Sequence, residues 1–400
     1  MITYFGHSEF RALGSLLYVR FPRYAGMQTM EVKILGAGPA GLSAAITAVR
    51  RGNEAVVYER RADCGGRFKG DLQGLENWSS KIDVLEEFES RGIRTSGFYT
   101  APFRELLLTE GRRGLRRVET SRPMFYLVKR GIVEGSIDQG LKKQAIEMGV
   151  RIEFNSCKTE KDVDIVATGP RRERIVAVDK GIVFSTSTED IAVALINDKA
   201  AYKAYAYLLV TGGYGCMCTV VFGDLKKLDE SFEETVRAFG GMFRFEVKNP
   251  VPVGGSASFY MGADGFVRNG RFYAGEAAGL QDAAFGFGIR SAVISGSMAT
   301  ESLIDGKDYK KEARGRYMRY MEATFTLRLL WEHGLARIYP DLYNAAGKIN
   351  KEMPLWLSGL FYRDTLINRG LFPLAQRILG DRREEGRSAT GVEGSKAFME

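Results

Sequence analysis

The sequence predicts an α/β protein with a nucleotide-binding βαβ domain, an inserted β-sheet domain and a helical C-terminal region. Three observations indicate this fold. A glycine-rich turn follows an apolar run near residue 36, strand-like segments dominate residues 175–222, and mainly helical patterns fill residues 308–380. The chain has 400 residues, of which 45% are hydrophobic, so it is long enough to bury the cores of two domains.

The glycine-rich turn at residues 36–41 stands between an apolar strand-like run and a helix-forming stretch. Gly36 permits a tight turn, Gly38 lets the backbone approach a pyrophosphate, and Gly41 lets the helix pack on the strand. The N-terminus of the following helix presents free N–H groups and the positive end of the helix dipole to an anion. This segment therefore predicts a phosphate-binding βαβ unit.

A second strand, residues 54–58, ends at Glu59. An acidic residue about 20 positions beyond such a turn suits hydrogen bonding to the ribose of an adenine dinucleotide. The glycine pattern alone is weak evidence. Strand, turn, helix, strand and acid in this order predict a dinucleotide site.

Two distant segments indicate which dinucleotide binds. Residues 163–169 form a short apolar strand ending in Thr168 and Gly169, which resembles the Ala-Thr-Gly segment of flavoproteins with two dinucleotide domains. Residues 270–296 contain Ala-Gly-Glu and a second glycine-rich run before a helix, which resembles the FAD-closing motif. In that motif the acid, here Glu276, binds the ribityl chain. The helix dipole favours negative charge on reduced flavin.

These segments together resemble the FAD-dependent oxidoreductases of the geranylgeranyl reductase family, within the wider para-hydroxybenzoate hydroxylase-like superfamily. The resemblance spans roughly residues 31–303 and includes Arg130, the helical pattern of residues 137–149 and the Gly-Gly-Tyr turn at residues 212–215. It implies a Rossmann-like FAD-binding domain of the GR2 type, built as three layers in the order β-sheet, β-sheet and α-helices. It also implies an inserted β-sheet that covers one face of the flavin and binds substrate.

The resemblance assigns cofactor contacts to several separate segments. These positions are Gly36, Gly38, Pro39, Ala40, Gly41, Glu59, Arg60, Gly66, Arg67, Arg130, Thr168, Gly169, Gly275, Glu276, Gly286, Gly288, Ile289 and Arg290. For Arg67 and Arg290, exposed salt bridges are the alternative. Tyr214 is the candidate for lining the catalytic site, with packing in a glycine-rich turn as its alternative.

The chain departs from the family pattern at two places. Cys216, Met217 and Cys218 follow the Gly-Gly-Tyr turn, where the family usually has a Trp and a Phe-Pro, so a differently shaped substrate cavity is expected. The closing motif carries Glu276 instead of the usual Asp. Together with residues 64–67, Cys-Gly-Gly-Arg, this glutamate also resembles the amine oxidase and carotenoid desaturase group, which binds FAD but acts on other substrates.

The expected domains are discontinuous in sequence. Residues 30–70, 124–170 and 262–306 are predicted to form the FAD-binding domain, residues 71–123 and 171–261 the substrate domain, and residues 307–380 a helical region. Residues 1–29 are either an extension or the result of a start codon assigned too far upstream, and residues 381–400 a disordered tail. In the substrate domain we expect a helix near 230–239 and strands at 175–178, 182–185, 191–196, 204–211, 219–222 and 242–247.

The resemblance implies a reductase that saturates prenyl double bonds of an isoprenoid or isoprenoid lipid, using hydride from reduced FAD and a proton from a Tyr, a Cys or water. A flavin amine oxidase or desaturase-type dehydrogenase is the second hypothesis. An electron-transfer flavoprotein without a small substrate is the third. NAD(P)H and ferredoxin both remain as electron donors, since the chain has one dinucleotide turn and no cysteine set for an iron–sulfur cluster.

The composition of the chain indicates which kinds of partner to expect among nucleic acids, metal ions and membranes. The net charge of +8 is scattered without a recognition motif, so we expect no nucleic acid. Four cysteines and two histidines lack metal-site spacing, and buried thiols in a reducing cytoplasm are expected. No apolar run reaches the ~20 residues needed to span a bilayer. The apolar residues 355–374, bordered by basic residues, suit either core packing or contact of a cytoplasmic protein with a membrane surface and a lipid substrate.

Overall fold

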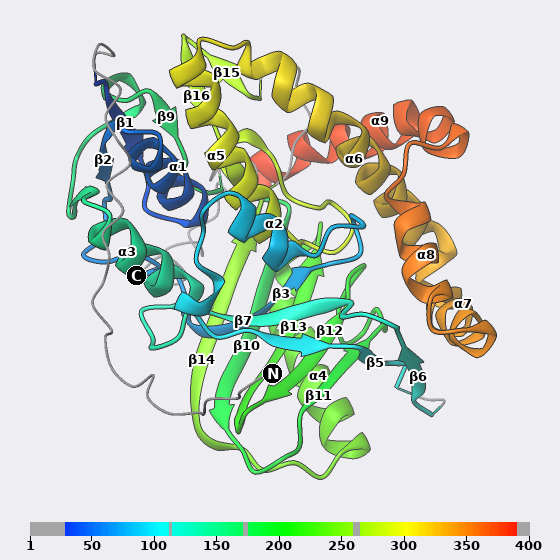
Figure 1. Ribbon diagram of the computed structural model, residues 1–400. Coiled ribbons are helices and arrows are strands. Elements are labelled where there is room, and N and C mark those ends of the chain that lie inside the picture. Colours follow the sequence, from blue (N-terminus) through cyan, green and yellow to red (C-terminus); the bar gives the residue numbers. More distant parts are fainter. Residues whose placement is uncertain (1–28, 112–113, 171–174, 259–264, 390–400) are drawn as a thin grey trace, which may run out of the picture.

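The computed structural model describes residues 29–111, 114–170, 175–258 and 265–389, with side chains up to residue 379. Residues 1–28, most of the expected N-terminal extension, lie outside the described residues. Three β-sheets and two groups of helices make up the fold (Figure 1).

A six-stranded sheet in the order β15-β16-β9-β1-β2-β8 carries the nucleotide turn. Its strands are β1 (Glu31–Leu35), β2 (Glu54–Tyr58), β8 (Arg151–Glu153), β9 (Ile165–Val166), β15 (Val267–Arg268) and β16 (Arg271–Tyr273). All neighbours pair in parallel except β15 and β16. Val32 and Ile34 are fully buried, as expected for a parallel strand covered on both faces.

Helices cover this sheet and fix the start of the nucleotide helix. They are α1 (Pro39–Arg50), α3 (Ile137–Glu147) and α5 (Ile289–Asp305), with α2 (Val84–Ser90) against α5. The backbones of α1 and α5 approach closely because Gly296 has no side chain: a Cβ there would lie 2.0 Å from the carbonyl oxygen of Ala40. The Gly296 contact therefore holds the N-terminal turn of α1 in place.

A small antiparallel sheet, β3-β7-β4, lies between the nucleotide domain and a larger sheet (Figure 1). Its strands are β3 (Lys69–Glu76), β7 (Phe125–Gly131) and β4 (Ala101–Phe103). Short 3-10 turns lie between other elements of the chain: η1 (Thr95–Gly97), η2 (Glu160–Asp162), η4 (Leu225–Lys227) and η5 (Gly275–Ala278).

The seven-stranded sheet, in the order β14-β10-β13-β12-β11-β5-β6, combines both segments expected to form the substrate domain. Its strands are β5 (Glu105–Thr109), β6 (Arg116–Glu119), β10 (Ala177–Ser185), β11 (Ile191–Leu195), β12 (Ala206–Thr211), β13 (Tyr214–Phe222) and β14 (Lys248–Ala257). Helix α4 (Leu228–Met242) packs on one face, and the other face borders a large cavity.

Several predicted strand limits in this sheet are wrong. Residues 175–178 and 182–185 belong to one strand, β10, and β13 begins at Tyr214 because Gly212 and Gly213 make a tight hairpin turn with φ of +56° and +76°. The strand expected at residues 242–247 does not form. Its alternating Phe243 and Phe245 instead pack over Phe239 and Phe184 on the outer face of the sheet.

The C-terminal region is helical, as predicted. It consists of α6 (Tyr309–Leu330), a π-helical turn η6 (Trp331–Leu335), α7 (Ala336–Ile349), α8 (Met353–Phe361) and α9 (Leu366–Ala389). Helix α9 continues through Ala389, so the disordered tail predicted from residue 381 is wrong up to that point, and residues 390–400 lie outside the described residues. None of the described helices has the length and apolar content needed to cross a bilayer.

Candidate functional site

A cavity of about 2510 Å³ lies where the nucleotide domain, the three-stranded and seven-stranded sheets and the C-terminal helices meet. Sites for single small ligands typically enclose ~300–1000 Å³, so this one has room for a dinucleotide and a second molecule. Most of the positions expected to contact a cofactor line it: Gly36, Gly38, Pro39, Ala40, Glu59, Arg60, Gly66, Arg67, Arg130, Thr168, Gly169, Glu276, Gly286, Gly288 and Ile289.

The nucleotide turn is shaped by three glycines with different surroundings. A Cβ at Gly36, where φ is +101°, would lie 2.4 Å from the carbonyl oxygen of Ala167, and one at Gly41 would lie 1.9 Å from that of Gly36. Around Gly38, by contrast, a Cβ would meet no atom within 4 Å. The first two glycines are thus required by packing inside the protein. Gly38 leaves open space on the cavity side, at the N-terminus of α1, where N–H groups lack helical partners.

Glu59 is fixed at the end of β2 by the turn itself. Its Oε2 accepts a hydrogen bond from the Ala37 N–H at 2.8 Å, and its Oε1 accepts one from the Arg61 N–H at 2.9 Å. Each carboxylate oxygen keeps a further lone pair for a donor such as a ribose hydroxyl. This arrangement fits the role expected for an acid at this position.

Arg130 is held rigidly at the wall of the cavity. Its Nε and Nη2 donate to the two carboxylate oxygens of Asp138 at 2.9 and 3.1 Å, and its Nη1 donates to Gln73 at 3.0 Å. The guanidinium also lies 4.2 Å from the ring centre of Phe68. Because Asp138 is fully buried, this two-point ion pair fixes a positive group at the cavity wall, beside Phe68.

Glu276 and Arg67 connect the cavity to the seven-stranded sheet. The Glu276 carboxylate accepts from the Ser258 N–H at 2.9 Å and lies 3.4 Å from the Arg67 guanidinium, which also donates to the carbonyl of Ser256. Burial raises the pKa of Glu276, and Arg67 opposes that shift. The pair therefore presents acceptor and donor atoms together at the cavity wall.

Four expected site residues do not line the cavity. Gly41 and Gly275 serve packing; the Gly275 N–H, for instance, donates to Ser295 at 2.8 Å. The Tyr214 hydroxyl donates to the carbonyl of Gly70 at 3.0 Å, so its ring lies outside the cavity wall.

Arg290 is the fourth residue, and its side chain turns away from the cavity. It is buried and donates through Nε to Glu87 at 2.9 Å, tying α5 to α2. Neither the cofactor contact nor the exposed salt bridge expected for Arg290 is what the structure shows: it forms a buried ion pair.

Asp179 is a cavity residue that the sequence analysis missed. It lies on β10 opposite Gly255 of β14, where a Cβ would sit 2.8 Å from the Asp179 carboxylate. Burial raises its pKa to about 7, the nearby Asp71 adds to the rise, and Arg67 opposes it. A carboxyl group in this state can exchange a proton near neutral pH. Residues 179–181 looked like a break between two strands, which hid the position.

The far end of the cavity is an aromatic chamber. The chamber is formed by aromatic residues from the segment after β3, the large sheet, the loop before α5 and the C-terminal region. They are Trp78, Tyr205, Tyr207, Phe285, Phe287, Trp331, Tyr339, Tyr343 and Tyr362. Three hydroxyl groups are already bonded: Tyr205 donates to the Phe285 carbonyl and Tyr362 to Asp282, each at 2.6 Å, and the Tyr343 hydroxyl lies 2.9 Å from that of Ser358. The chamber therefore offers mainly ring surface to a bound molecule.

Three of the four cysteines, Cys64, Cys216 and Cys218, are buried. Cys64 is fully buried, and burial raises the pKa of its thiol to about 12. The buried Cys216 and Cys218 have sulfurs 3.9 Å apart, and the pKa of Cys218 is also raised, chiefly by its hydrogen bond to Cys216. A protonated thiol is a poor nucleophile. Within the described ranges, no cluster of three or more His, Cys, Asp or Glu side chains suits a metal ion.

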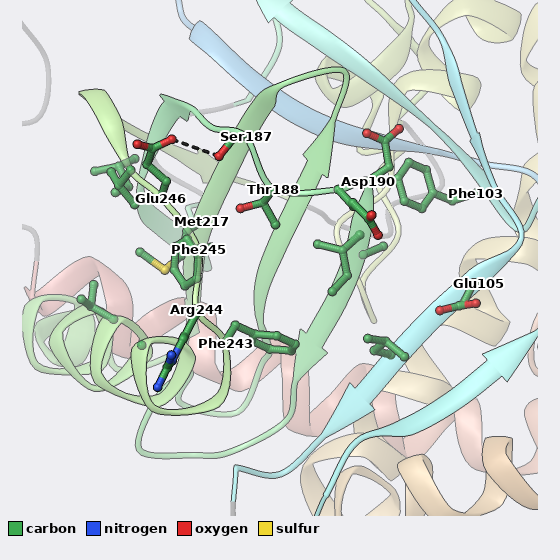
Figure 2. Close-up of a pocket in the computed structure, with 18 of the residues that line it drawn as sticks. Phe103, Glu105, Ser187, Thr188, Asp190, Met217, Phe243, Arg244, Phe245 and Glu246 are labelled. Atoms are coloured by element: carbon green, nitrogen blue, oxygen red, sulfur yellow. Dashed lines mark hydrogen bonds between the residues drawn. The ribbon is translucent and has the colours of Figure 1, made fainter.

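A second depression, of about 1480 Å³, lies on the opposite face of the seven-stranded sheet, beside α4 (Figure 2). Phe243 and Phe245 line it, and Ser187 donates to Glu246 at 3.1 Å across its edge. The Asp190 carboxylate is occupied by Thr211 and the Gly212 N–H, each at 2.8 Å. Since none of the nucleotide-binding segments reaches it, the first cavity is the candidate functional site.

Comparison with known proteins agrees with this architecture. Residues 34–73 match an NAD(P)-binding Rossmann-like domain. A geranylgeranyl bacteriochlorophyll reductase-like protein from Thermoplasma acidophilum superimposes with a TM-score of 0.63 and 16% identity, over 86% of this chain and 99% of that one. The p-nitrophenol 4-monooxygenase of Pseudomonas putida gives a TM-score of 0.57 and 16% identity, over 85% and 100% of the two chains.

An NADH oxidase of Thermoanaerobacter brockii is 44% identical over 76 residues, which are 18% of this chain and 11% of that protein. The match thus spans about a tenth of the relative's length. At the identities of the solved structures, the likeness establishes a shared fold. The predicted fold class, a Rossmann-like domain with an inserted β-sheet and C-terminal helices, is confirmed.

Proposed function

We propose that this chain is an FAD-dependent oxidoreductase that reduces a carbon–carbon double bond of an apolar, isoprenoid-like molecule. The observation that carries the proposal is one continuous cavity that joins the nucleotide turn to the aromatic chamber. The cavity exceeds the usual size for one ligand, and its two ends differ in chemistry: glycine backbone and fixed charges at one, aromatic rings at the other.

The residues present fit FAD. The open space at Gly38 is a cradle that any side chain would fill, and Arg130 supplies fixed positive charge to the same cavity. Glu59 suits the adenosine ribose and Glu276 the ribityl hydroxyls. Gly286, Gly288 and Ile289 place the N-terminus of α5 at the cavity, where its dipole favours an anion. Reduced FAD bound there supplies a hydride to a substrate carbon.

Reduction of a double bond also requires one proton, and we assign this proton to Asp179. The carboxyl O–H of Asp179 breaks as its proton bonds to one carbon of the alkene while hydride bonds to the other, so that no free carbanion forms. The carboxylate left behind takes a proton from solvent. Asp179 suits this role because it borders the cavity and its pKa is raised to about 7. Tyr214, the earlier candidate, does not border the cavity.

The aromatic chamber is consistent with a lipid-like substrate, but ring surfaces also suit an amine held for oxidation. An amine oxidase or desaturase-type dehydrogenase is therefore the second candidate. A pure electron carrier is the third candidate; it needs no chamber for a second molecule, whereas this cavity contains one. NAD(P)H or a ferredoxin is proposed as the source of electrons.

Flavin spectra separate these functions. Purified protein is reduced with dithionite without oxygen, and a geranylgeranyl lipid or a set of amines is then added. Return of the oxidised flavin bands with the lipid alone supports the reductase. Bleaching of oxidised flavin by an amine supports the oxidase instead. If the oxidised flavin bands return slowly and neither compound speeds their return, an electron carrier is favoured.

A further inference from the structure

Helices α7–α9 carry an unusual share of the exposed apolar surface. Six of the fourteen exposed large hydrophobic residues in the described part of the chain lie here: Ile338, Ile349, Trp356, Leu366, Ile367 and Leu374. Leu366 is 83% exposed and Ile349 is 68% exposed. Scattered single residues of this kind are normal on a protein surface, whereas a concentration in one region indicates an interaction site.

The exposed residues follow helical spacing. In α7, Ile338, Leu342, Ala345 and Ile349 recur at i, i+4, i+7 and i+11, which places them on one face. A neighbouring stripe of α7, Tyr339 and Tyr343, forms part of the cavity wall. Core packing therefore accounts for one apolar stripe of the helix, whereas Ile338 and Ile349 on the other stripe remain exposed.

Helix α9 repeats the pattern near its start. Ile367, Leu371 and Leu374 recur at i, i+4 and i+7, with Leu366 beside them, and Phe372 and Leu379 turn toward the protein. Figure 1 shows α7, α8 and the beginning of α9 together at one end of the molecule, away from the nucleotide domain. We call the exposed residues of these helices the α7–α9 face.

The charge around the α7–α9 face is positive. Residues 336–379 contain six basic and three acidic residues. Asp341 and Asp364 are already paired with Arg116 and Arg369. Four of the basic residues form no ion pair with any residue the structure describes: Arg337, Lys348, Arg363 and Arg377. An apolar stripe bordered by unpaired Lys and Arg fits the interface of a bilayer that contains anionic lipid.

A second copy of the chain fits this face less well. In a symmetric dimer the same patch meets itself, so the unpaired basic residues of two copies would be brought together. Anionic head groups would instead neutralise these charges, and Trp356, which is 50% exposed, is of the residue type enriched at membrane–water interfaces.

We propose that the α7–α9 face rests on the surface of an anionic phospholipid bilayer. Tyr343 of α7, Ser358 of α8 and Leu379 of α9 line the cavity from the inner side of these helices, as does Tyr362 between α8 and α9. The face and the chamber are therefore separated by the thickness of one layer of helices. In combination with the proposed function, this arrangement lets a lipid substrate pass from the bilayer to the cavity without crossing water.

Vesicle co-sedimentation tests the proposal with the full chain. We expect the protein to sediment with vesicles of phosphatidylcholine and phosphatidylglycerol, to stay in solution with phosphatidylcholine alone, and to be released by salt. The double variant L366D/I367D is expected to bind at least tenfold more weakly. Both side chains are exposed, and acidic residues in the first turn of α9 are compatible with the helix dipole, so the fold is retained.

Ile146→Asp is the matched control, because Ile146 is 50% exposed and lies on α3 of the nucleotide domain. It should bind vesicles like the wild type. The proposal is overturned if the wild type ignores anionic vesicles, or if L366D/I367D binds as the wild type does. A dimer in light scattering that L366D/I367D dissociates, without vesicle binding, would assign the face to a second copy and also overturn it. Vesicle binding requires neither flavin nor turnover, so its failure is distinct from a failure of the proposed function.

Discussion

At the scale of single residues, the three glycines of the nucleotide turn serve different purposes although their spacing looks uniform. Gly36 and Gly41 are required because a side chain there would clash with the protein itself. Gly38 is required because a ligand approaches the backbone there from the cavity. The pattern predicts that all three are needed. Only the structure shows that Gly38 faces open space, because this depends on where Ala167 and the other strand ends lie.

Gly38→Ala should therefore separate binding from folding. We expect the variant to unfold at the wild-type temperature, because a Cβ meets no atom within 4 Å, and to bind FAD about tenfold or more weakly. Gly38→Glu should purify without flavin. Gly240→Ala, another open position but in α4, is the control. Full flavin occupancy in Gly38→Glu would refute the assignment of the site.

Arg290 is the opposite case. The sequence predicted that it contacts the cofactor, but in the structure it stabilises the fold. Arg290→Met leaves the buried Glu87 carboxylate with Arg316 as its remaining partner. We expect a loss of about 3–5 kcal/mol in the free energy of unfolding, because one partner of a buried ion pair is removed. The flavin spectrum of the folded variant should be unchanged. If the flavin spectrum of the variant shifts while its unfolding by urea is unchanged, Arg290 would have to be assigned to the cofactor after all.

The raised pKa of Asp179 predicts how the stability of the protein depends on pH. Its pKa is about 7 in the folded protein and 3.8 ordinarily, so between these values the folded protein holds a proton that the unfolded chain lacks. Stability contributed by this proton is present at low pH and is lost as pH rises through this window. Asp179→Asn should thus be more stable than the wild type at pH 8, by about 4 kcal/mol at most, and similar at pH 4.

The charged and titratable groups that face Asp179 are Asp71 on β3, Arg67 before β3, Cys218 on β13, and Tyr205 and Tyr207 near β12. In turnover, the wild-type rate of flavin reoxidation by substrate should fall as pH rises through about 7. In the Asp179→Asn variant, flavin reoxidation by substrate should be slow at every pH and should show no such decrease. An unchanged pH profile in Asp179→Asn would remove Asp179 from proton delivery.

At the scale of elements, local patterns predicted the nucleotide unit well because strand, turn and helix are adjacent in sequence. The edges of the large sheet were predicted less well. The alternation of Phe243 and Phe245 resembles a strand, yet these rings cover a sheet formed by distant segments. Likewise, β5 pairs in parallel with β11, a contact between residues far apart in sequence that no local pattern contains.

The contact between α1 and α5 is the element on which the site depends. Gly296→Ala would place a Cβ 2.0 Å from the carbonyl oxygen of Ala40. We expect a loss of about 1–3 kcal/mol from overpacking, together with weaker flavin binding as the start of α1 moves. Gly315→Ala, in the exposed interior of α6 where a Cβ meets no atom, should instead gain about 0.5–1 kcal/mol. Equal effects from the two substitutions would contradict this account.

At the scale of the whole molecule, segments from all parts of the described chain meet at one cavity. The sequence motifs predicted its nucleotide end, since each motif binds through a short stretch of backbone. The aromatic chamber was not predicted, because its walls combine β12 with helices that follow more than a hundred residues later. Tyr205 and Phe285, for example, meet only after folding.

The central claim is that one cavity holds both a flavin and an apolar alkene. The most direct test is the visible spectrum of the purified protein, reduced without oxygen and then mixed with a geranylgeranyl lipid. The account predicts flavin bands near ~450 nm that bleach on reduction and return with the lipid, but not with its saturated counterpart. Protein without flavin bands would contradict the account altogether, and bands that stay bleached with the lipid would contradict the assigned substrate.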